Sequence, residues 1–416
     1  MKKLLLILLC LPFIGFGQGW IQEYDLPSDP GDWNIVSNVE QTNDGGYMIY
    51  SSGWLVKTNS TGDTLWTRIG GYGGGLGNDG FQTADNGYIR FLADSILKYD
   101  EFGNILWGKK DYMHTKRGIQ TTDNGFISVG WVGQNKVNNY KIAAEYYSIY
   151  KTDSLGDSLW MKVIGNSING IEGIASSVDQ TNDGGYITVG KKESPTQDIW
   201  LIKFDSLGDS LWSKSFNFDS AYCKGSFVQQ TTDGGYIISG RGSNNGCTQL
   251  MLLKTFVDGN IEWVKMYPDN ACVPDGSYGK YVQQTSDGGY IIMSNYYEYQ
   301  QPFDEQKMWL LKTNSIGDTI WTRKFGNSFG YGTAVRQTYD GGYILTGLFY
   351  QNPDSVNIAL IKLDSQGTIS SIIELNKNKK LVDIRNILGQ RTPYRRNAPL
   401  FYIYDDGTVE KKIIIE

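Results

Sequence analysis

Two kinds of short segment recur along this chain of 416 residues: continuous apolar runs, and runs in which apolar and polar residues alternate. None of them shows the 3.6-residue period of an amphipathic helix. The stretch from Val178 to Gly190 gives the first half of the pattern. An alternating run ends in Gln-Thr, an Asp-Gly-Gly corner follows, and an aromatic residue leads into β-branched residues. Because glycine accepts the positive φ of tight hairpin turns, this half predicts two antiparallel strands.

The second half of the pattern predicts two more strands. Ile199 to Ile202 is a continuous apolar run, too short for a buried helix and of the right length for a strand covered on both faces. A polar turn at Asp205 to Asp209 then leads into Ser210 to Lys214. The unit is therefore predicted to be a sheet of four short strands.

Seven copies of this unit follow one another, with corners about 40 to 60 residues apart. A repeat of this length that contains only strands is typical of a propeller blade. The sequence thus predicts an all-β fold, a seven-bladed β-propeller. The corners are Asp44-Gly45-Gly46, Asp85-Asn86-Gly87, Asp123-Asn124-Gly125, Asp183-Gly184-Gly185, Asp233-Gly234-Gly235, Asp287-Gly288-Gly289 and Asp340-Gly341-Gly342.

A regular spacing between glycine and tryptophan indicates how the ring of predicted blades closes. In six copies a turn glycine is followed four residues later by tryptophan, but Gly367 of the seventh copy is followed at that distance by Ser371. Trp20, near the N-terminus, has no turn glycine before it. We predict that the segment around Trp20 is the outermost strand of the seventh blade, paired with Ile358 to Leu363, so that the ring has no open edge. The alternative is that Trp20 belongs to an ordinary ordered N-terminus.

A cation stands two positions after each of the six tryptophans. Because residues two apart in a strand share a face, its stem is expected to fill the gap between blades while its tip reaches water. A ring of basic contacts for an anion is the functional alternative. The cations are Arg68, Lys109, Lys162, Lys214, Lys265 and Arg323.

The segment from Met1 to Gly17 has the features of a secretory signal. Lys2 and Lys3 precede an apolar core from Leu4 to Phe13, and small residues precede Gln18. The segment is too short for a stable membrane anchor. Since no later apolar stretch approaches membrane length, we expect no integral membrane span once the signal is removed.

Charge narrows the range of partners. The net charge of the chain is −6, while the signal and the region after Asn376 are both basic. The predicted ring therefore has a net charge of about −12. Nucleic acid and anionic membranes are therefore poor candidates for its partner.

The cysteines predict one disulfide. Cys223, Cys247 and Cys272 remain after removal of the signal, and an odd number in an oxidising compartment leaves one thiol, with three alternative pairings. We favour Cys223 with Cys247, which would brace one blade. A metal site is not predicted, because His114 is the only histidine and no paired-cysteine motif occurs.

The two ends of the predicted ring differ. One end carries the uniform Asp-Gly-Gly and Asp-x-x-Gly turns, and the other carries loops of varied length that are rich in aromatic and amide residues. Loops on a rigid scaffold often carry recognition sites, so we predict a ligand-binding face there; the alternative is that the rings only cap the blade ends. Its candidate residues are Trp33, Tyr112, Trp131, Tyr140, Tyr296, Tyr297 and Tyr350.

No catalytic constellation is evident in the sequence. His114 cannot form a base system with a second imidazole. Two carboxylates facing each other across a central channel could cleave a glycosidic bond, but most acidic residues recur in the turns, where Asp caps the local backbone. We therefore predict no catalytic residues, no cofactor and no metal.

The repeat resembles the Gln-Thr-x-Asp-Gly-Gly-Tyr propeller repeats of exported proteins from Bacteroidota-type bacteria, over about Trp20 to Ile373. This resemblance implies a fold and a secreted context, and no activity. The predicted ring spans residues 18–373, with a linker at 374–378.

Residues 379–416 resemble the C-terminal sorting domain of type IX secretion cargo. The similarity rests on Ile387-Leu388-Gly389 and on Phe401-Tyr402-Ile403-Tyr404, followed by an Asp406-Gly407 hairpin. It implies transport across the outer membrane by the type IX machinery, followed by removal of the tail. The alternative is a small accessory hairpin.

Together these features predict an exported propeller at the outer cell surface or beyond it, acting as a binding module for a glycan or a surface protein. One alternative is a carbohydrate-active enzyme with acidic residues near the channel. The other is a purely structural surface or adhesion module.

Overall fold

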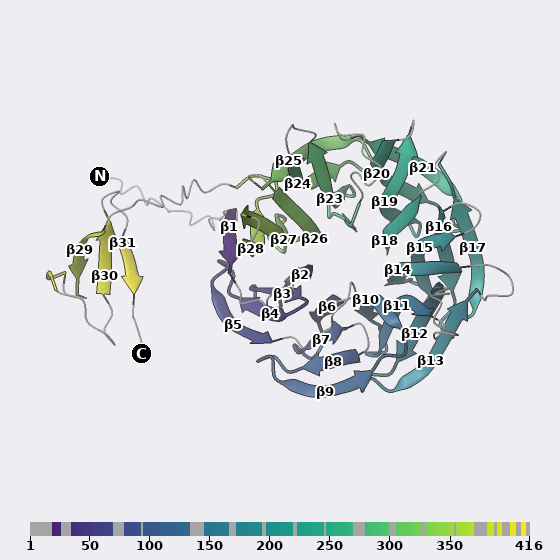
Figure 1. Ribbon diagram of the computed structural model, residues 1–416, viewed down its shortest axis with the longest axis horizontal. Helices are drawn as coiled ribbons and strands as arrows, with labels where there is room; N and C mark the ends of the chain where they lie inside the picture. Colours follow the sequence, from purple (N-terminus) through teal and green to yellow (C-terminus); the bar gives the residue numbers. More distant parts are fainter. Residues whose placement is uncertain are drawn as a thin grey trace, which may run out of the picture. The chain divides into compact units, whose positions relative to one another are not determined.

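The computed structural model describes residues 19–25, 35–69, 79–92, 95–133, 145–165, 172–193, 197–218, 223–244, 247–268, 279–298, 305–326, 329–352, 355–369, 381–386, 389–392, 400–404 and 409–412. These residues form strands and no helix. Seven four-stranded blades stand around a central axis, each with its first strand innermost (Figure 1). The predicted seven-bladed β-propeller is confirmed.

Blades 1 to 3 comprise β2 (Val36–Gln41), β3 (Tyr47–Ser51), β4 (Trp54–Thr58) and β5 (Thr64–Ile69); β6 (Asp79–Gln82), β7 (Tyr88–Phe91), β8 (Ser95–Tyr99) and β9 (Ile105–Lys110); and β10 (His114–Gln120), β11 (Phe126–Gly133), β12 (Glu145–Thr152) and β13 (Ser158–Ile164). Blades 4 and 5 comprise β14 (Glu172–Gln180), β15 (Tyr186–Glu193), β16 (Gln197–Phe204) and β17 (Ser210–Phe216), and β18 (Lys224–Gln230), β19 (Tyr236–Asn244), β20 (Cys247–Thr255) and β21 (Ile261–Tyr267). Blade 6 comprises β22 (Tyr281–Gln284), β23 (Tyr290–Glu298), β24 (Glu305–Thr313) and β25 (Thr319–Phe325).

Blade 7 is built from both ends of the ring. It comprises β26 (Phe329–Gln337), β27 (Tyr343–Asn352), β28 (Ser355–Leu363) and, as its outer strand, β1 (Trp20–Tyr24). β1 pairs antiparallel with β28, with Trp20 opposite Lys362 and Tyr24 opposite Ile358 (Figure 1). The predicted closure is thus confirmed.

Each tryptophan of the register packs onto the next blade. Trp160 lies 6.2 Å from Tyr186 between ring centroids, and its ring covers Gly208, whose φ of +80° places it in the left-handed region. Trp20 makes the same contacts with blade 1, because its ring lies 5.7 Å from Tyr47 and covers Gly62. The N-terminal strand therefore supplies the seventh copy of an inter-blade contact.

The uniform turns hold the blades together through glutamine. In each blade the Gln of Gln-Thr accepts a hydrogen bond at Oε1 from a backbone N–H in the preceding hairpin, at 2.8 to 2.9 Å. The last of these, from Tyr339 to Gln41, joins blade 7 to blade 1. The donor and acceptor pairs are Asn43 and Gln82, Ala84 and Gln120, Thr122 and Gln180, Asn182 and Gln230, Thr232 and Gln284, Ser286 and Gln337, and Tyr339 and Gln41.

A buried lysine fixes each hairpin corner. Lys203 on β16 is 5% exposed at its side chain, and its Nζ contacts the corner residue Asp183 and donates to the carbonyl of Phe204 at 2.9 Å. Every blade repeats this ion pair. The pairs are Lys57 and Asp44, Lys98 and Asp85, Lys151 and Asp123, Lys203 and Asp183, Lys254 and Asp233, Lys312 and Asp287, and Lys362 and Asp340.

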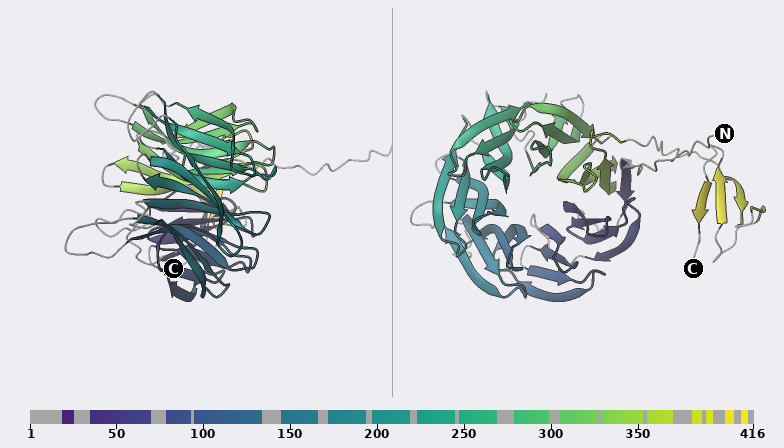
Figure 2. Two further views of the ribbon diagram at one scale, coloured as in Figure 1. Left: turned by 90° about the vertical axis from the view of Figure 1, so that its right-hand side faces the viewer. Right: turned by 180° about the vertical axis from the view of Figure 1, so that it is seen from behind.

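The outer cations pack between blades, as their spacing predicts. Lys109 donates to Asp157 of the next blade at 2.7 Å, and its stem lies against Gly156. Arg323 instead donates to the backbone carbonyl of Gly367 at 2.8 Å. Seen edge-on and from behind, the outer strands form the rim of the ring (Figure 2).

The predicted Cys223–Cys247 disulfide is wrong. Cys247 is disulfide-bonded, whereas Cys223 keeps its thiol. Cys223 immediately precedes β18, the innermost strand of blade 5. Its N–H donates to the Gln197 carbonyl at 3.0 Å, and it is buried among the apolar residues between blades 4 and 5. The partner of Cys247 lies outside the described residues.

The chain divides into two compact units, residues 1–370 and 371–416. The second contains β29 (Leu381–Arg385), β30 (Leu400–Tyr404) and β31 (Val409–Lys412), which form a three-stranded antiparallel sheet. The predicted hairpin corner at Asp406-Gly407 lies outside the described residues.

Candidate functional site

Two layers of side chains lie on the innermost strands of the ring. The position before each ring-forming glutamine and the position two residues earlier share one face of the innermost strand. The turn-side layer consists of Glu40, Phe81, Ile119, Asp179, Gln229, Gln283 and Arg336. The deep layer consists of Asn38, Asp79, Arg117, Ser177, Phe227, Tyr281 and Ala334.

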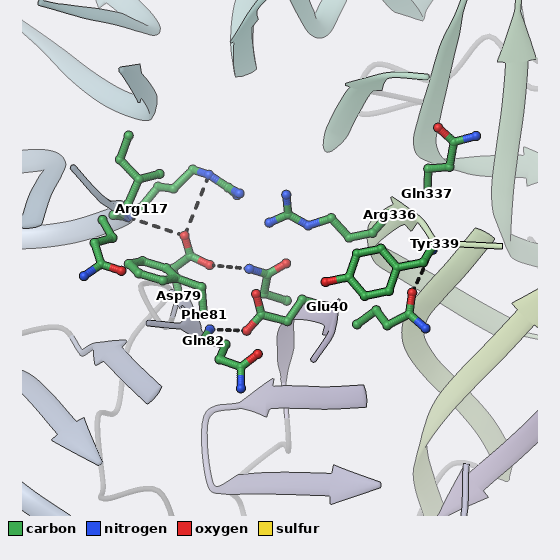
Figure 3. A pocket seen from close by; sticks show the side chains of 13 residues that line it. Glu40, Asp79, Phe81, Gln82, Arg117, Arg336, Gln337 and Tyr339 are labelled. Atoms are coloured by element: carbon green, nitrogen blue, oxygen red, sulfur yellow. Dashed lines mark hydrogen bonds and ion pairs between the residues drawn. The ribbon is translucent and has the colours of Figure 1, made fainter. Parts of the chain in front are cut away.

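A cavity of about 380 Å³ lies at the turn end of this channel. We call it the channel pocket. It is formed by blades 7, 1, 2 and 3, and its lining includes Glu40, Asp79, Phe81, Arg117, Arg336 and Tyr339 (Figure 3). Tyr339 is 74% exposed, so the pocket reaches the surface beside this ring.

Asp79 is buried in a network that spans three blades. Its Oδ1 accepts hydrogen bonds from the Asn38 amide and the Gly80 N–H, both at 3.0 Å. Its Oδ2 accepts from the Gly118 N–H at 3.4 Å and lies 3.7 Å from Nε of Arg117. This carboxylate is therefore held in place by its neighbours.

Glu40 combines an anchored oxygen with a raised pKa. Its Oε1 accepts hydrogen bonds from the Tyr50 hydroxyl, at 2.6 Å, and from the Gln82 N–H. Burial raises the pKa of Glu40 to about 7, although these hydrogen bonds and the charge of Arg336 oppose the rise. Near neutral pH the channel pocket therefore contains a carboxyl group that is protonated in part of the molecules.

Two guanidinium groups face the pocket from opposite sides (Figure 3). Arg117 lies 4.2 Å from the ring centroid of Phe227, and Arg336 lies 4.7 Å from that of Tyr281. The Nε atoms of both arginines are buried and have no hydrogen-bond partner among the described residues. The aromatic rings thus hold the guanidinium planes.

The channel pocket lies beside blades in which the turn-side residue does not accept the backbone hydrogen bond that is made elsewhere in the ring. In blades 4, 5 and 6 the turn-side residue accepts the backbone N–H of the next glutamine, with distances of 2.7 to 2.8 Å. Glu40 does the same in blade 1. Phe81, Ile119 and Arg336 have no side-chain acceptor, and all three line the channel pocket.

The predicted aromatic residues lie mostly on strands. Tyr112 is 65% exposed and lies 6.3 Å from Tyr150. Trp131 belongs to β11, stacks on His114 at 4.7 Å, and has Nζ of Lys116 at 4.8 Å over its ring. Blade 3 therefore brings Tyr112 and Trp131 to one end of the ring.

The other predicted residues are less available as contacts. Tyr296 on β23 is buried against Trp309, and the Tyr297 hydroxyl accepts from the Gln306 amide at 2.9 Å. Tyr350 is half-buried on β27, and burial raises its pKa. Trp33 and Tyr140 lie outside the described residues. None of the five described residues lines the channel pocket.

A basic cluster lies at the opposite, loop end of the inner strands. Burial and the nearby charges of Lys116, Arg241 and Lys191 lower the pKa of Lys224 to about 8, and Glu145 opposes this effect. The sequence pattern does not place these side chains together, because they come from three blades.

Neither a metal-binding group nor a membrane helix is found in the part of the chain that the structure describes. No set of three or more His, Cys, Asp or Glu residues there could hold a metal ion. No helix there is long and apolar enough to cross a membrane.

No protein-family model matches the chain, and no curated protein matches it. Among solved structures it is similar to Chaetomium thermophilum Sqt1 bound to the N-terminus of a ribosomal protein, with a TM-score of 0.50, 11% identity, and coverage of 82% of this chain and 98% of that one. It is also similar to a Bacteroides caccae protein of unknown function, with a TM-score of 0.42, 12% identity, and coverage of 70% and 93%. At such low sequence identity the likeness to Sqt1 shows the fold alone.

Proposed function

We propose that this β-propeller is an exported binding module and that its channel pocket receives the ligand. The observation that carries this proposal is the contrast between constant and variable positions in the seven blades. The ring glutamine, the corner aspartate and the buried lysine are present in every blade. The channel layers instead differ from blade to blade and place charged groups around a cavity.

The ligand is a glycan or a protein segment. Polar and charged groups around a small cavity suit a ligand that is held by a few placed hydrogen bonds. Sqt1, whose fold resembles this one, was solved with the N-terminus of a ribosomal protein, which supports a protein segment as a ligand for such a ring. Tyr112 and Trp131 at the loop end offer a second contact surface for a larger ligand.

A binding screen of the mature ring tests this proposal. Glycans and peptides are immobilised, and binding is measured for the wild type and for a Phe81→Ala variant that alters the pocket wall. Saturable binding that weakens in the variant supports the proposal. A Tyr112→Ala variant serves as the matched control for the loop end. The channel-pocket assignment is overturned if ligands bind and only Tyr112→Ala weakens them, and the binding function is overturned if nothing binds.

Delivery to the cell surface by type IX secretion is part of the proposal. It is supported by the apolar N-terminal segment with its lysines and by the sorting-domain resemblance of residues 379–416. The test expresses the full chain and a form ending at residue 378 in a bacterium with this machinery. The full chain should appear outside the cell, and the shortened form should accumulate in the periplasm. Equal export of both forms would overturn the role of the tail.

Glycoside hydrolysis is a second candidate function. It is favoured by Glu40, whose pKa of about 7 suits a general acid, and by the ionisable neighbour Asp79 in the same pocket. Release of reducing sugars from a polysaccharide panel, lost in Glu40→Gln, would support hydrolysis. Saturable glycan binding without turnover would exclude it for that panel.

A further inference from the structure

Arg336 is the residue at which blade 7 departs from the structural pattern of its neighbours. Gln229 and Gln283, at the same position of blades 5 and 6, accept the backbone N–H of the following glutamine at 2.7 and 2.8 Å. A guanidinium has only donors, so Arg336 cannot accept the corresponding N–H of Gln41. In the described part of the chain it forms no ion pair, and its Nε has no hydrogen-bond partner.

Arg117 in the deep layer forms an ion pair with Asp79, but its Nε also has no hydrogen-bond partner among the described residues. Its guanidinium lies over Phe227 at 4.2 Å and Tyr281 at 5.2 Å, while its Nε is 3.7 Å from the Asp79 carboxylate, beyond hydrogen-bonding distance. A guanidinium fork matches the two oxygens of a carboxylate. Two guanidinium groups face one cavity, and neither Nε has a hydrogen-bond partner among the described residues. This arrangement points to an anion as an additional partner.

The charges around the cavity select the kind of anion. Glu40 and Asp79 belong to the same pocket lining, and these carboxyl groups would repel a dianion such as a phosphate monoester more than a single carboxylate. The cavity of about 380 Å³ is at the small end of ligand pockets. Phe81 on the wall and the exposed Tyr339 at the mouth offer ring faces for the rest of the ligand.

We propose that the channel pocket binds the carboxylate of a sugar acid, a hexuronate or the terminal unit of an acidic glycan, between Arg117 and Arg336. This inference rests on the proposed binding function and names its ligand class. The carboxylate occupies the space between the two guanidinium groups. The sugar ring lies toward Phe81 and Tyr339.

The test uses the full mature chain and isothermal titration with D-glucuronate, D-glucose, glucose 6-phosphate and an acidic peptide. The wild type should bind glucuronate and should bind the other three at least about tenfold more weakly. Arg336→Gln should lower the affinity for glucuronate at least about tenfold, as expected for the loss of a charged hydrogen bond. Arg323→Gln, which removes a cation from the outer rim, is the matched control and should bind as the wild type does.

Thermal unfolding of the same variants separates this role from a structural one. Arg336→Gln places at position 336 the residue that blades 5 and 6 use, so it should unfold at the wild-type temperature or above it. If Arg336 only neutralised its acidic neighbours, the variant would unfold at a lower temperature and would bind glucuronate as well as the wild type.

The other possible results of these experiments also test the inference. Equal binding of glucose and glucuronate, or unchanged affinity in Arg336→Gln, overturns this inference and leaves the binding function standing. Preferential binding of the acidic peptide that depends on Arg336 overturns the sugar-acid assignment. If nothing on the panel binds, but the wider screen finds a ligand, only the inference is lost; failure of both experiments removes the proposed function too.

Discussion

At the scale of single residues, the ring separates structural positions from variable ones. Glu40 shows how a structural position can acquire a chemical property. It accepts the Gln82 N–H, as Gln229 and Gln283 accept theirs in blades 5 and 6. A carboxyl group in place of the amide keeps this hydrogen bond and adds a buried titratable group.

Replacing Glu40 by Gln should therefore stabilise the ring at alkaline pH. Burial raises the pKa of Glu40 from 4.5 to about 7, so the folded state holds this proton more tightly than the unfolded state. Its effect on stability is absent below about pH 4.5, and it becomes increasingly unfavourable as the pH rises to about 7. The shift corresponds to at most about 3 kcal/mol.

Urea unfolding followed by tryptophan fluorescence measures this effect. The gain of Glu40→Gln over the wild type should be larger at pH 8 than at pH 5. Glu101→Gln, at an exposed position in a turn, is the control and should show no such change. A pH-independent difference between Glu40→Gln and the wild type would contradict the prediction.

At the scale of the elements, the Asp-Gly-Gly hairpin is stabilised from the third strand of its own blade. Lys203 is buried, and Asp183 also accepts hydrogen bonds from the Thr181 hydroxyl, at 2.5 Å, and from the Gly185 N–H, at 3.0 Å. The residues of the Thr-x-Asp-Gly-Gly motif thus form one hydrogen-bonded unit. Its lysine comes from outside this motif, on the strand that pairs with the second strand of the hairpin.

Acid should therefore destabilise the hairpins of all blades together. Hydrogen bonds from Thr and Lys side chains, opposed by partial burial, lower the pKa of Asp123, Asp183 and Asp287 from 3.8 to about 2. Their contribution to stability is complete above about pH 4 and is lost as the pH falls through about 2. Thermal unfolding followed by circular dichroism should show a steep fall of the midpoint over this range.

A single substitution tests the same ion pair at neutral pH. Asp183→Asn leaves the buried Lys203 ammonium without its carboxylate and should cost about 1–3 kcal/mol. Asp157→Asn, which breaks the exposed pair with Lys109, should cost less than about 1 kcal/mol. Equal losses in the two variants would show that burial of the lysine does not matter.

The sequence predicted the strands, the number of blades and the closing strand because each leaves a local and repeated pattern. The Gly-x-x-x-Trp spacing predicted the place of Trp20 correctly, since the same packing recurs at every blade junction. The buried lysines and the ring glutamines also recur in every copy, and an alignment of the seven copies could have identified them. The channel pocket could not be predicted in this way, because its charged and aromatic residues come from four blades and differ from one blade to the next.

The cysteines show a similar limit. Cys223 and Cys247 flank the first two strands of blade 5 in sequence, but proximity in sequence does not determine where a side chain points. The thiol of Cys223 is buried among the apolar residues between two blades. Disulfide pairing depends on this packing, which three cysteines and their spacing do not reveal.

At the scale of the whole ring, stability depends on joining the first and last strands of the propeller sequence. β1 is five residues long and pairs with β28, and the Tyr339–Gln41 hydrogen bond lies at the same blade junction. Closure removes the open edge that β28 would otherwise expose. An open edge of this kind can pair with another molecule.

A form that lacks residues 19–25 should therefore associate. Its β28 would expose unpaired N–H and C=O groups, and Gly62 and Tyr47 of blade 1 would lose the Trp20 ring. Light scattering after size-exclusion chromatography should show dimers or larger species that increase with protein concentration, and addition of a peptide of residues 19–25 should restore the monomer. Trp160→Ala, which removes one inter-blade contact and leaves every strand paired, is the control and should stay monomeric while losing about 0.5–3 kcal/mol of stability. If the shortened form were monomeric and as stable as the wild type, β1 would be an accessory strand and the ring would not depend on it.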